Sequence, residues 1–180
     1  MRKLLERENA ALLVIDVQQK LFPLMQQSCE MMHALQKLVK GFQICGRPIL
    51  TSEQYPKGIG ETVGSLLELV GQRHSKTTFS CAADPSFRKL IENTNATQWV
   101  LGGLEAHVCV LQTACQLLEM GKEVIVANDA ISSRSIYTYS TAIADMRDFG
   151  VRIASSESIL FELVRDSQAA EFKQISKLVK

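Results

Sequence analysis

The chain has 180 residues, of which 46% are hydrophobic and 22% are charged, and its formal net charge is +1. This size and composition predict one soluble globular domain with a substantial core. The near-zero charge offers no electrostatic footprint for nucleic acid, and no apolar run has the length of a membrane-spanning helix. The first residues lack the apolar core of a signal peptide, so we expect a cytoplasmic protein without nucleic-acid or membrane partners.

The cysteines and histidines form no recognisable metal or disulfide pattern. The five cysteines are odd in number and include no CxxC pair, so free thiols are expected in a reducing compartment. The histidines are too scattered for a zinc signature. We therefore expect neither a structural metal nor a cofactor. The residues concerned are Cys29, Cys45, Cys81, Cys109, Cys115, His33, His74 and His107.

Strand-like and helix-like segments alternate along the first half of the chain. The almost wholly apolar stretch Ala10–Val17 is typical of a parallel strand buried on both faces. Helical periodicity over Glu30–Cys45 stops at Gly46. The next expected elements are a strand at Pro48–Thr51, a turn-rich loop at Ser52–Gly60, a helix at Ser65–Val70, a strand at His74–Lys76 and a helix at Pro85–Asn93 capped by Asp84.

The same alternation continues to the end of the chain. The expected elements are a strand at Gln98–Gly102, a helix from near Cys109 to Met120, a strand at Glu123–Ala127, a helix at Tyr137–Phe149, a strand at Val151–Ala154 and a helical remainder. Repeated strand-then-helix order predicts one α/β domain over residues 1–180, a Rossmann-like six-stranded parallel sheet in a three-layer αβα arrangement. Ligands of such sheets bind beyond the carboxyl ends of the strands, where the strand order reverses.

The segment Val100–Ala114 carries a candidate nucleophile. Its apolar run breaks at Gly102-Gly103, where we expect a short turn, and a helix-compatible stretch follows with Cys109 near its start. The positive end of a helix lowers the pKa of a thiol and so favours the nucleophilic thiolate. Free N–H groups at the same end can hold an oxyanion. The alternative is that Cys109 is a buried small hydrophobic residue, as free cysteines often are.

Two further reactive residues follow predicted strands. Asp16 closes the first strand, and a carboxylate there is costly to bury unless it is paired. Lys76, at the end of another strand, is a candidate partner. Taken singly, Asp16 could be a structural cap and Lys76 a surface residue. Together with Cys109 they form a base, a cation and a nucleophile at one edge of the sheet.

Five ordered segments make the chain resemble the isochorismatase-like hydrolases, a family that includes nicotinamidases and N-carbamoylsarcosine amidohydrolase. The resemblance extends over nearly the whole chain and is strongest to the isochorismatase domain-containing subgroup. The segments are LLVIDVQ at Leu12–Gln18, TSEQYP at Thr51–Pro56, KTTFS at Lys76–Ser80, GLEAHVCVLQTA at Gly103–Ala114 and NDAISSRS at Asn128–Ser135.

The resemblance implies a catalytic triad of Asp16, Lys76 and Cys109, as in the cysteine amidohydrolase branch. It also implies a cis peptide bond between Leu104 and Glu105 and an oxyanion hole formed by the N–H groups of Glu105 and Cys109. For the Glu105 side chain we expect a local hydrogen bond. The implied function is hydrolysis of a small amide, carbamoyl or related C–N substrate through a thioester. The alternative is a catalytically silent relative that acts as an oligomeric scaffold or binding protein.

The chain departs from two branches of that family. Nicotinamidases hold a metal with an Asp and His residues after the second strand, whereas this chain has Glu53 in place of the Asp and no His there. We therefore expect no catalytic metal and regard nicotinamide as a poor substrate candidate. Isochorismatases that cleave a vinyl ether lack the nucleophilic cysteine, so Cys109 argues against isochorismate. Members of the family usually form homo-oligomers, which implies a dimer, tetramer or larger assembly.

Four residues are candidates for lining the pocket around a small-molecule substrate, although each could equally belong to core or surface packing. They are Phe22, Tyr55, Phe79 and His107. A dinucleotide-binding domain is the remaining alternative for this architecture. It fails on sequence, because GGLEAH lacks the GxGxxG spacing and no glycine-rich loop follows the first strand.

Overall fold

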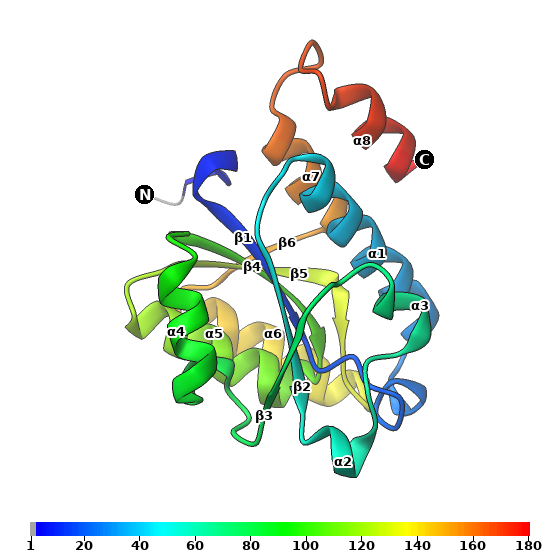
Figure 1. The fold of residues 1–180 in the computed structure, drawn as a ribbon, viewed down its shortest axis with the longest axis vertical. Coiled ribbons are helices and arrows are strands. Elements are labelled where there is room, and N and C mark those ends of the chain that lie inside the picture. Colours follow the sequence, from blue (N-terminus) through cyan, green and yellow to red (C-terminus); the bar gives the residue numbers. More distant parts are fainter. Residues whose placement is uncertain (1–2) are drawn as a thin grey trace.

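Six parallel strands form the central sheet, as predicted. The computed structural model describes residues 3–180. The sheet has the order β3-β2-β1-β4-β5-β6, so the strand order reverses between β1 and β4 (Figure 1). The strands are β1 (Ala10–Ile15), β2 (Ile49–Gln54), β3 (Arg73–Lys76), β4 (Gln98–Leu104), β5 (Glu123–Ser132) and β6 (Arg152–Ala154).

Helices cover both faces of this sheet and complete the expected three layers (Figure 1). One face carries α1 (Ser28–Ile44), α7 (Ser156–Val164) and α8 (Phe172–Val179), and the other carries α4 (Pro85–Asn93), α5 (Leu111–Glu119) and α6 (Ile136–Asp148). Two short helices, α2 (Pro56–Ile59) and α3 (Gly64–Leu67), lie between β2 and β3. None of the helices in the described part of the chain has both the length and the apolar character needed to cross a membrane.

The apolar first strand divides its side chains between two cores. Leu12 and Val14 belong to the hydrophobic cluster under α1 and α7, whereas Leu13 and Ile15 belong to the cluster under α4, α5 and α6. All four side chains are fully buried. Alternation along a strand sends neighbouring residues to opposite faces, so a strand covered on both faces must be apolar throughout.

Strands β2, β4 and β5 extend further toward the carboxyl edge than the sequence predicts. The expected turn at Gly102-Gly103 is wrong, because both glycines lie in β4 beside β1. Gly103 has φ +120°, and a Cβ there would lie 2.1 Å from the Ile15 carbonyl oxygen. Glycine therefore lets β4 approach β1 where a larger residue could not.

The elements that lead to Cys109 also differ from a simple helix start. After β4 the chain forms one π-helical turn, Ala106–Val110, and α5 begins only at Leu111.

The predicted cap of α4 is confirmed, since the Asp84 carboxylate accepts hydrogen bonds from the N–H groups of Ser86 and Phe87, both at 3.0 Å.

Candidate active site

Asp16 follows β1 and points its carboxylate into a buried polar cluster. Its backbone is in the left-handed region, with φ +50°, and its N–H donates to the Ser52 carbonyl oxygen at 3.2 Å. Both carboxylate oxygens are hydrogen-bonded. Ser52 Oγ donates to Oδ1 at 2.6 Å, and Lys76 Nζ donates to Oδ2 at 2.7 Å. This paired environment is what a fully buried carboxylate requires.

Lys76 is the last residue of β3, and its ammonium is enclosed by oxygen atoms. Besides Asp16, Nζ lies 2.8 Å from Gln54 Oε1, 2.9 Å from the Phe79 carbonyl oxygen and 3.1 Å from the Thr78 carbonyl oxygen. Burial opposes the charged ammonium and is the largest single influence, but Asp16, Cys81 and Cys109 together outweigh it, so the pKa of Lys76 is raised above its ordinary value. Lys76 therefore stays charged at neutral pH and serves as a fixed cation.

Cys109 lies in the π-helical turn and is 6% exposed. Burial raises the pKa of its thiol, and Asp16 raises it further through its charge and through hydrogen bonding, while Lys76 acts in the opposite direction. The expectation that a helix start lowers this pKa is therefore wrong. Burial and the nearby carboxylate dominate, so the resting group is a neutral thiol with a carboxylate available as proton acceptor.

A second thiol, Cys81, is fully buried near the same charges. Its backbone N–H donates to Thr113 Oγ1 at 3.0 Å. Burial raises the pKa of the Cys81 thiol to about 12, with Asp16 contributing in the same direction and Lys76 opposing it. Cys81 is thus a neutral core thiol at physiological pH.

The turn before Cys109 is tied to a distant segment through Glu105. The Leu104–Glu105 peptide bond is cis. The Glu105 carbonyl oxygen accepts hydrogen bonds from Val108 N–H at 3.0 Å and Val110 N–H at 3.2 Å. The Glu105 carboxylate accepts two hydrogen bonds from the Arg134 guanidinium, at 2.9 and 3.0 Å. The expectation of a local hydrogen bond for the Glu105 side chain is therefore wrong, because its partner Arg134 lies in the segment after β5.

The four candidate pocket residues occupy different environments. Tyr55 and Phe79 are 55% and 53% exposed. The Tyr55 N–H donates a hydrogen bond to the Lys76 carbonyl oxygen, and the Lys76 ammonium donates one to the Phe79 carbonyl oxygen. Phe22 is half-buried and packs against the core on the α1 side. His107 is half-buried with Nδ1 3.0 Å from Ser133 Oγ. The structure thus brings two exposed aromatic residues beside Lys76 and leaves Phe22 in core packing.

Two residues that contact the Asp16–Lys76 pair, Ser52 and Gln54, were not predicted from the sequence as site residues. Both belong to β2, and strand alternation sends them to the face that carries Asp16. Glu53, between them, points to the opposite face. It accepts hydrogen bonds from Thr62 N–H and Oγ1, both at 2.7 Å. Among residues 3–180 no three His, Cys, Asp or Glu side chains are grouped to hold a metal ion.

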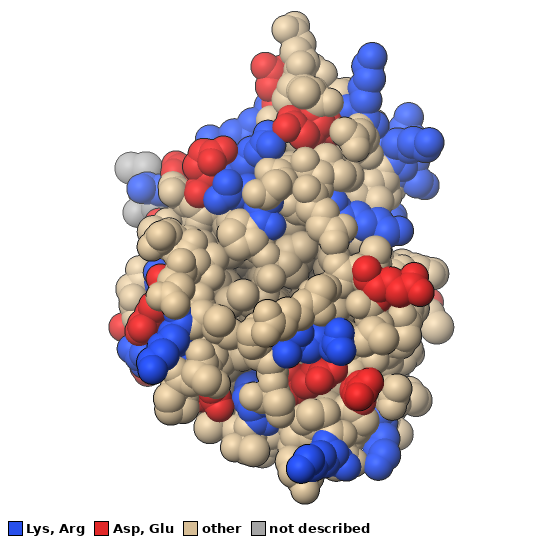
Figure 2. Space-filling model, in the orientation of Figure 1, with Lys and Arg blue, Asp and Glu red and all other residues tan. Residues whose placement is uncertain are grey.

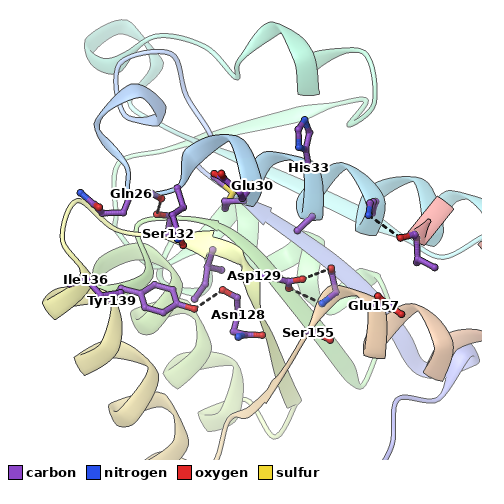
Figure 3. Close-up of a pocket in the computed structure, with 17 residues that line it drawn as sticks. Gln26, Glu30, His33, Asn128, Asp129, Ser132, Ile136, Tyr139, Ser155 and Glu157 are labelled. Carbon is purple, nitrogen blue, oxygen red and sulfur yellow. Dashed lines mark hydrogen bonds between the residues drawn. The ribbon is translucent and has the colours of Figure 1, made fainter.

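A separate cavity of about 500 Å³ lies between α1, the end of β5 and the start of α7 (Figure 3). None of Asp16, Lys76 and Cys109 lines it. Its carboxylate Asp129 accepts hydrogen bonds from Ser156 N–H at 2.7 Å and Oγ at 2.6 Å, which fix the start of α7. The candidate active site is therefore the group formed by Asp16, Lys76 and Cys109, and not this cavity.

The fold places the chain in the three-layer α/β class, with a buried carboxylate, ammonium and thiol where the strand order reverses. The family model of the isochorismatase domain matches residues 10–158. The chain therefore belongs to the isochorismatase family.

Individual relatives agree with this assignment. Isochorismatase domain-containing protein 1 of Salmo salar is 38% identical over 167 residues, which cover 92% of this chain and 59% of the relative. The chain thus spans less than two thirds of that protein's length. The structure of the MAR1 ribonuclease from Caenorhabditis elegans is 34% identical, with a TM-score of 0.92 and coverage of 98% of this chain and 92% of that chain.

A more distant structure shows the fold alone. The ycaC gene product of Escherichia coli, described as an octameric hydrolase of unknown specificity, is 21% identical. Its TM-score is 0.93, with coverage of 99% of this chain and 90% of that chain.

Proposed function

We propose that the protein is a cysteine-dependent hydrolase that acts on a small amide, carbamoyl or related C–N substrate. Membership of the isochorismatase family supports assignment as a hydrolase. The observation that carries the finer proposal is the contact between Asp16 and the Lys76 ammonium at 2.7 Å, together with the influence of the same carboxylate on the pKa of the Cys109 thiol. These groups supply a base, a fixed cation and a nucleophile.

In the proposed first step, Asp16 accepts the Cys109 proton while the sulfur attacks the substrate's carbonyl carbon. The raised pKa of Cys109 makes this acceptor necessary, because little thiolate exists at neutral pH without it. Lys76 holds the carboxylate through its contact with Oδ2, and its charge favours the thiolate. The pair therefore provides proton removal at the moment of attack.

The tetrahedral oxyanion would rest on the N–H groups of Glu105 and Cys109. Each such donor is worth about 3 kcal/mol in well-studied enzymes. The hydrogen bonds from Val108 and Val110 to the Glu105 carbonyl oxygen, and the Arg134 contact to its carboxylate, support a fixed turn for this purpose. Collapse of the intermediate breaks the C–N bond, and the leaving amine takes the proton from Asp16. Water then cleaves the thioester, which releases the acid and restores the thiol.

The substrate would meet the aromatic residues beside Lys76. Phe79 and Tyr55 are the best placed of the four candidates, because both are exposed and both neighbour the polar cluster. His107 and Phe22 remain weaker candidates for this role, since one contacts Ser133 and the other packs against the core.

We also propose that the protein forms a homo-oligomer. Large apolar side chains are more than half exposed in several segments, and contact with a second copy would cover them. They include Leu24, Ile136, Tyr137 and Phe149. The octameric ycaC gene product has the same fold. Size-exclusion chromatography with light scattering tests this proposal, and a monomer at micromolar concentration would reject it.

A screen of small amides, carbamoyl compounds and related esters tests the proposed function, with ammonia or acid release as the readout. The matched control is Cys109→Ala, which removes only the nucleophilic sulfur. We expect release by the parent protein and none by the variant. Release that survives in Cys109→Ala would reject the nucleophile. The absence of release from every compound would favour a catalytically silent scaffold or binding protein.

Ribonuclease activity is the second candidate function, because the C. elegans relative of known structure is named a ribonuclease. Basic and acidic side chains are interspersed around the face in Figure 2, and uncharged residues fill its centre. This face therefore offers no continuous basic track for RNA. Incubation of the parent and Cys109→Ala proteins with single-stranded RNA separates the two functions. Cleavage by the parent without amide hydrolysis would favour the ribonuclease.

A further inference from the structure

Ser52 is a buried hydroxyl residue to which the proposed reaction gives no role. It lies on β2 and is fully buried. Its Oγ donates to Asp16 Oδ1 at 2.6 Å, whereas the other carboxylate oxygen takes the Lys76 ammonium. The Ser52 hydroxyl thus binds the carboxylate oxygen that Lys76 does not contact.

A second hydrogen bond ties the same two residues together in the opposite direction. The Asp16 N–H donates to the Ser52 carbonyl oxygen at 3.2 Å. This bond anchors Asp16 where its backbone leaves the strand conformation, at φ +50°. The Ser52 side chain and backbone therefore fix both the carboxylate and the main chain of Asp16 relative to β2.

We propose that Ser52 is a positioning residue that holds the Asp16 carboxylate toward Cys109 and stabilises its charged form. The inference rests on the proposed function, in which Asp16 is the base. A hydroxyl that donates to a carboxylate stabilises the ionised state, because the neutral acid is a weaker acceptor. The other titratable groups facing Asp16 are Lys76 on β3, Cys109 in the π-helical turn and Cys81 in the turn before α4. Substitutions at Ser52 keep all three residues, although the Ser52 hydroxyl also interacts with the Cys81 thiol.

The test is the rate of Cys109 alkylation by iodoacetamide as a function of pH, followed by peptide mass spectrometry. This readout needs no substrate. Without the Ser52 hydroxyl, the carboxylate proposed to accept the Cys109 proton keeps Lys76 but loses the hydrogen bond to Oδ1. The acid limb of the profile is the pH range in which the alkylation rate of Cys109 falls as the pH is lowered. We therefore expect the acid limb of Ser52→Ala to lie about one pH unit above that of the parent. Ser52→Thr keeps a hydroxyl and should return the limb to within about 0.3 pH unit of the parent.

Thr51 provides a matched control on the same strand. It is also buried, it faces the opposite side of the sheet, and its hydroxyl has no hydrogen-bond partner among residues 3–180. Thr51→Val therefore removes a buried hydroxyl without touching Asp16, and the acid limb should stay in place. An equal shift in Thr51→Val, or an unchanged limb in Ser52→Ala, would overturn the assignment of Ser52.

Failure of the proposed function gives a different result. If Cys109 of the parent is not alkylated while other cysteines are, the nucleophile is rejected, and the role of Ser52 falls with it. If Cys109 of the parent reacts but the Ser52→Ala limb is unchanged, only the positioning role is rejected.

Discussion

Lys76 Nζ lies 2.7 Å from Asp16 Oδ2, and neither side chain is exposed to solvent. The two residues come from the ends of β3 and β1, which β2 separates in the sheet. A buried pair of this kind is costly to break by removing one partner, because the remaining charge has no counterion. In the proposed function, the contact therefore links the stability of the sheet edge to the reactivity of Cys109.

Replacing Lys76 by methionine tests that link. Lys76→Met leaves the Asp16 carboxylate buried without its cation, so we expect the free energy of unfolding to fall by about 3 to 5 kcal/mol. Urea denaturation followed by circular dichroism measures the change. The double variant Asp16→Asn/Lys76→Met should be more stable than the sum of the single losses predicts, because neither charge then remains. A loss below about 1 kcal/mol in Lys76→Met would show that the pair is not buried.

Alkaline pH should weaken the folded state through Cys81. Burial raises the pKa of this thiol from 9.0 to about 12. Between those values the unfolded chain has lost the proton that the folded protein retains, so the free energy of unfolding falls as the pH rises. The contribution of one such thiol falls by about 2 kcal/mol between pH 8 and pH 10.5.

Urea denaturation across that pH range, with a phosphine reductant present, measures this effect. Cys81→Ala should lose stability less steeply than the parent, whatever its stability at pH 8. Cys29→Ala is the control, because Cys29 is exposed and its removal should leave the slope unchanged. Identical slopes for the parent and Cys81→Ala would contradict the burial of this thiol.

Gly103 is a point where backbone geometry controls the site. An alanine Cβ there would lie 2.1 Å from the Ile15 carbonyl oxygen, and the residue has φ +120°. We expect Gly103→Ala to reduce the free energy of unfolding by about 3 kcal/mol and to slow amide hydrolysis, because β1 and β4 carry Asp16 and the turn of Cys109. Thermal unfolding and the ammonia-release assay measure both effects.

Gly64, at the start of α3, provides the contrast to Gly103. A Cβ there would meet nothing within 4 Å, and the residue does not have a positive φ. Gly64→Ala should therefore be neutral or stabilise the protein by up to about 1 kcal/mol. Equal losses in both variants would mean that the approach of β4 to β1 is not the cause.

The grouping of Asp16, Lys76 and Cys109 could be predicted from the sequence because each lies at or after the carboxyl end of a predicted strand, and these ends meet at one edge of a parallel sheet. Ser52 and Gln54 could not, because the turn-rich composition of Ser52–Gly60 indicates a loop. Pairing of β2 with β1 through Ser52, and with β3 through Gln54, extends the strand beyond its composition. Sheet pairing across distant segments thus overrides the local turn signal.

Two other features depend on three-dimensional proximity. The contact between Glu105 and Arg134 joins residues 29 positions apart, and no periodicity in the sequence connects them. The raised pKa of Cys109 follows from burial and from Asp16, neither of which a helix-start pattern reports. The local sequence could indicate that Cys109 lies near the start of a helix, but not that the Asp16 carboxylate would raise the pKa of its thiol.

The most direct test of the central claim is detection of an acyl group on Cys109 during turnover. A substrate found in the amide screen is mixed with the parent protein, quenched in acid within milliseconds to seconds, and mapped by peptide mass spectrometry. The proposed function predicts a transient acyl adduct on the peptide that contains Cys109, sensitive to hydroxylamine and absent in Cys109→Ala. Turnover with the acyl group on another residue, or undiminished turnover by Cys109→Ala, would contradict it.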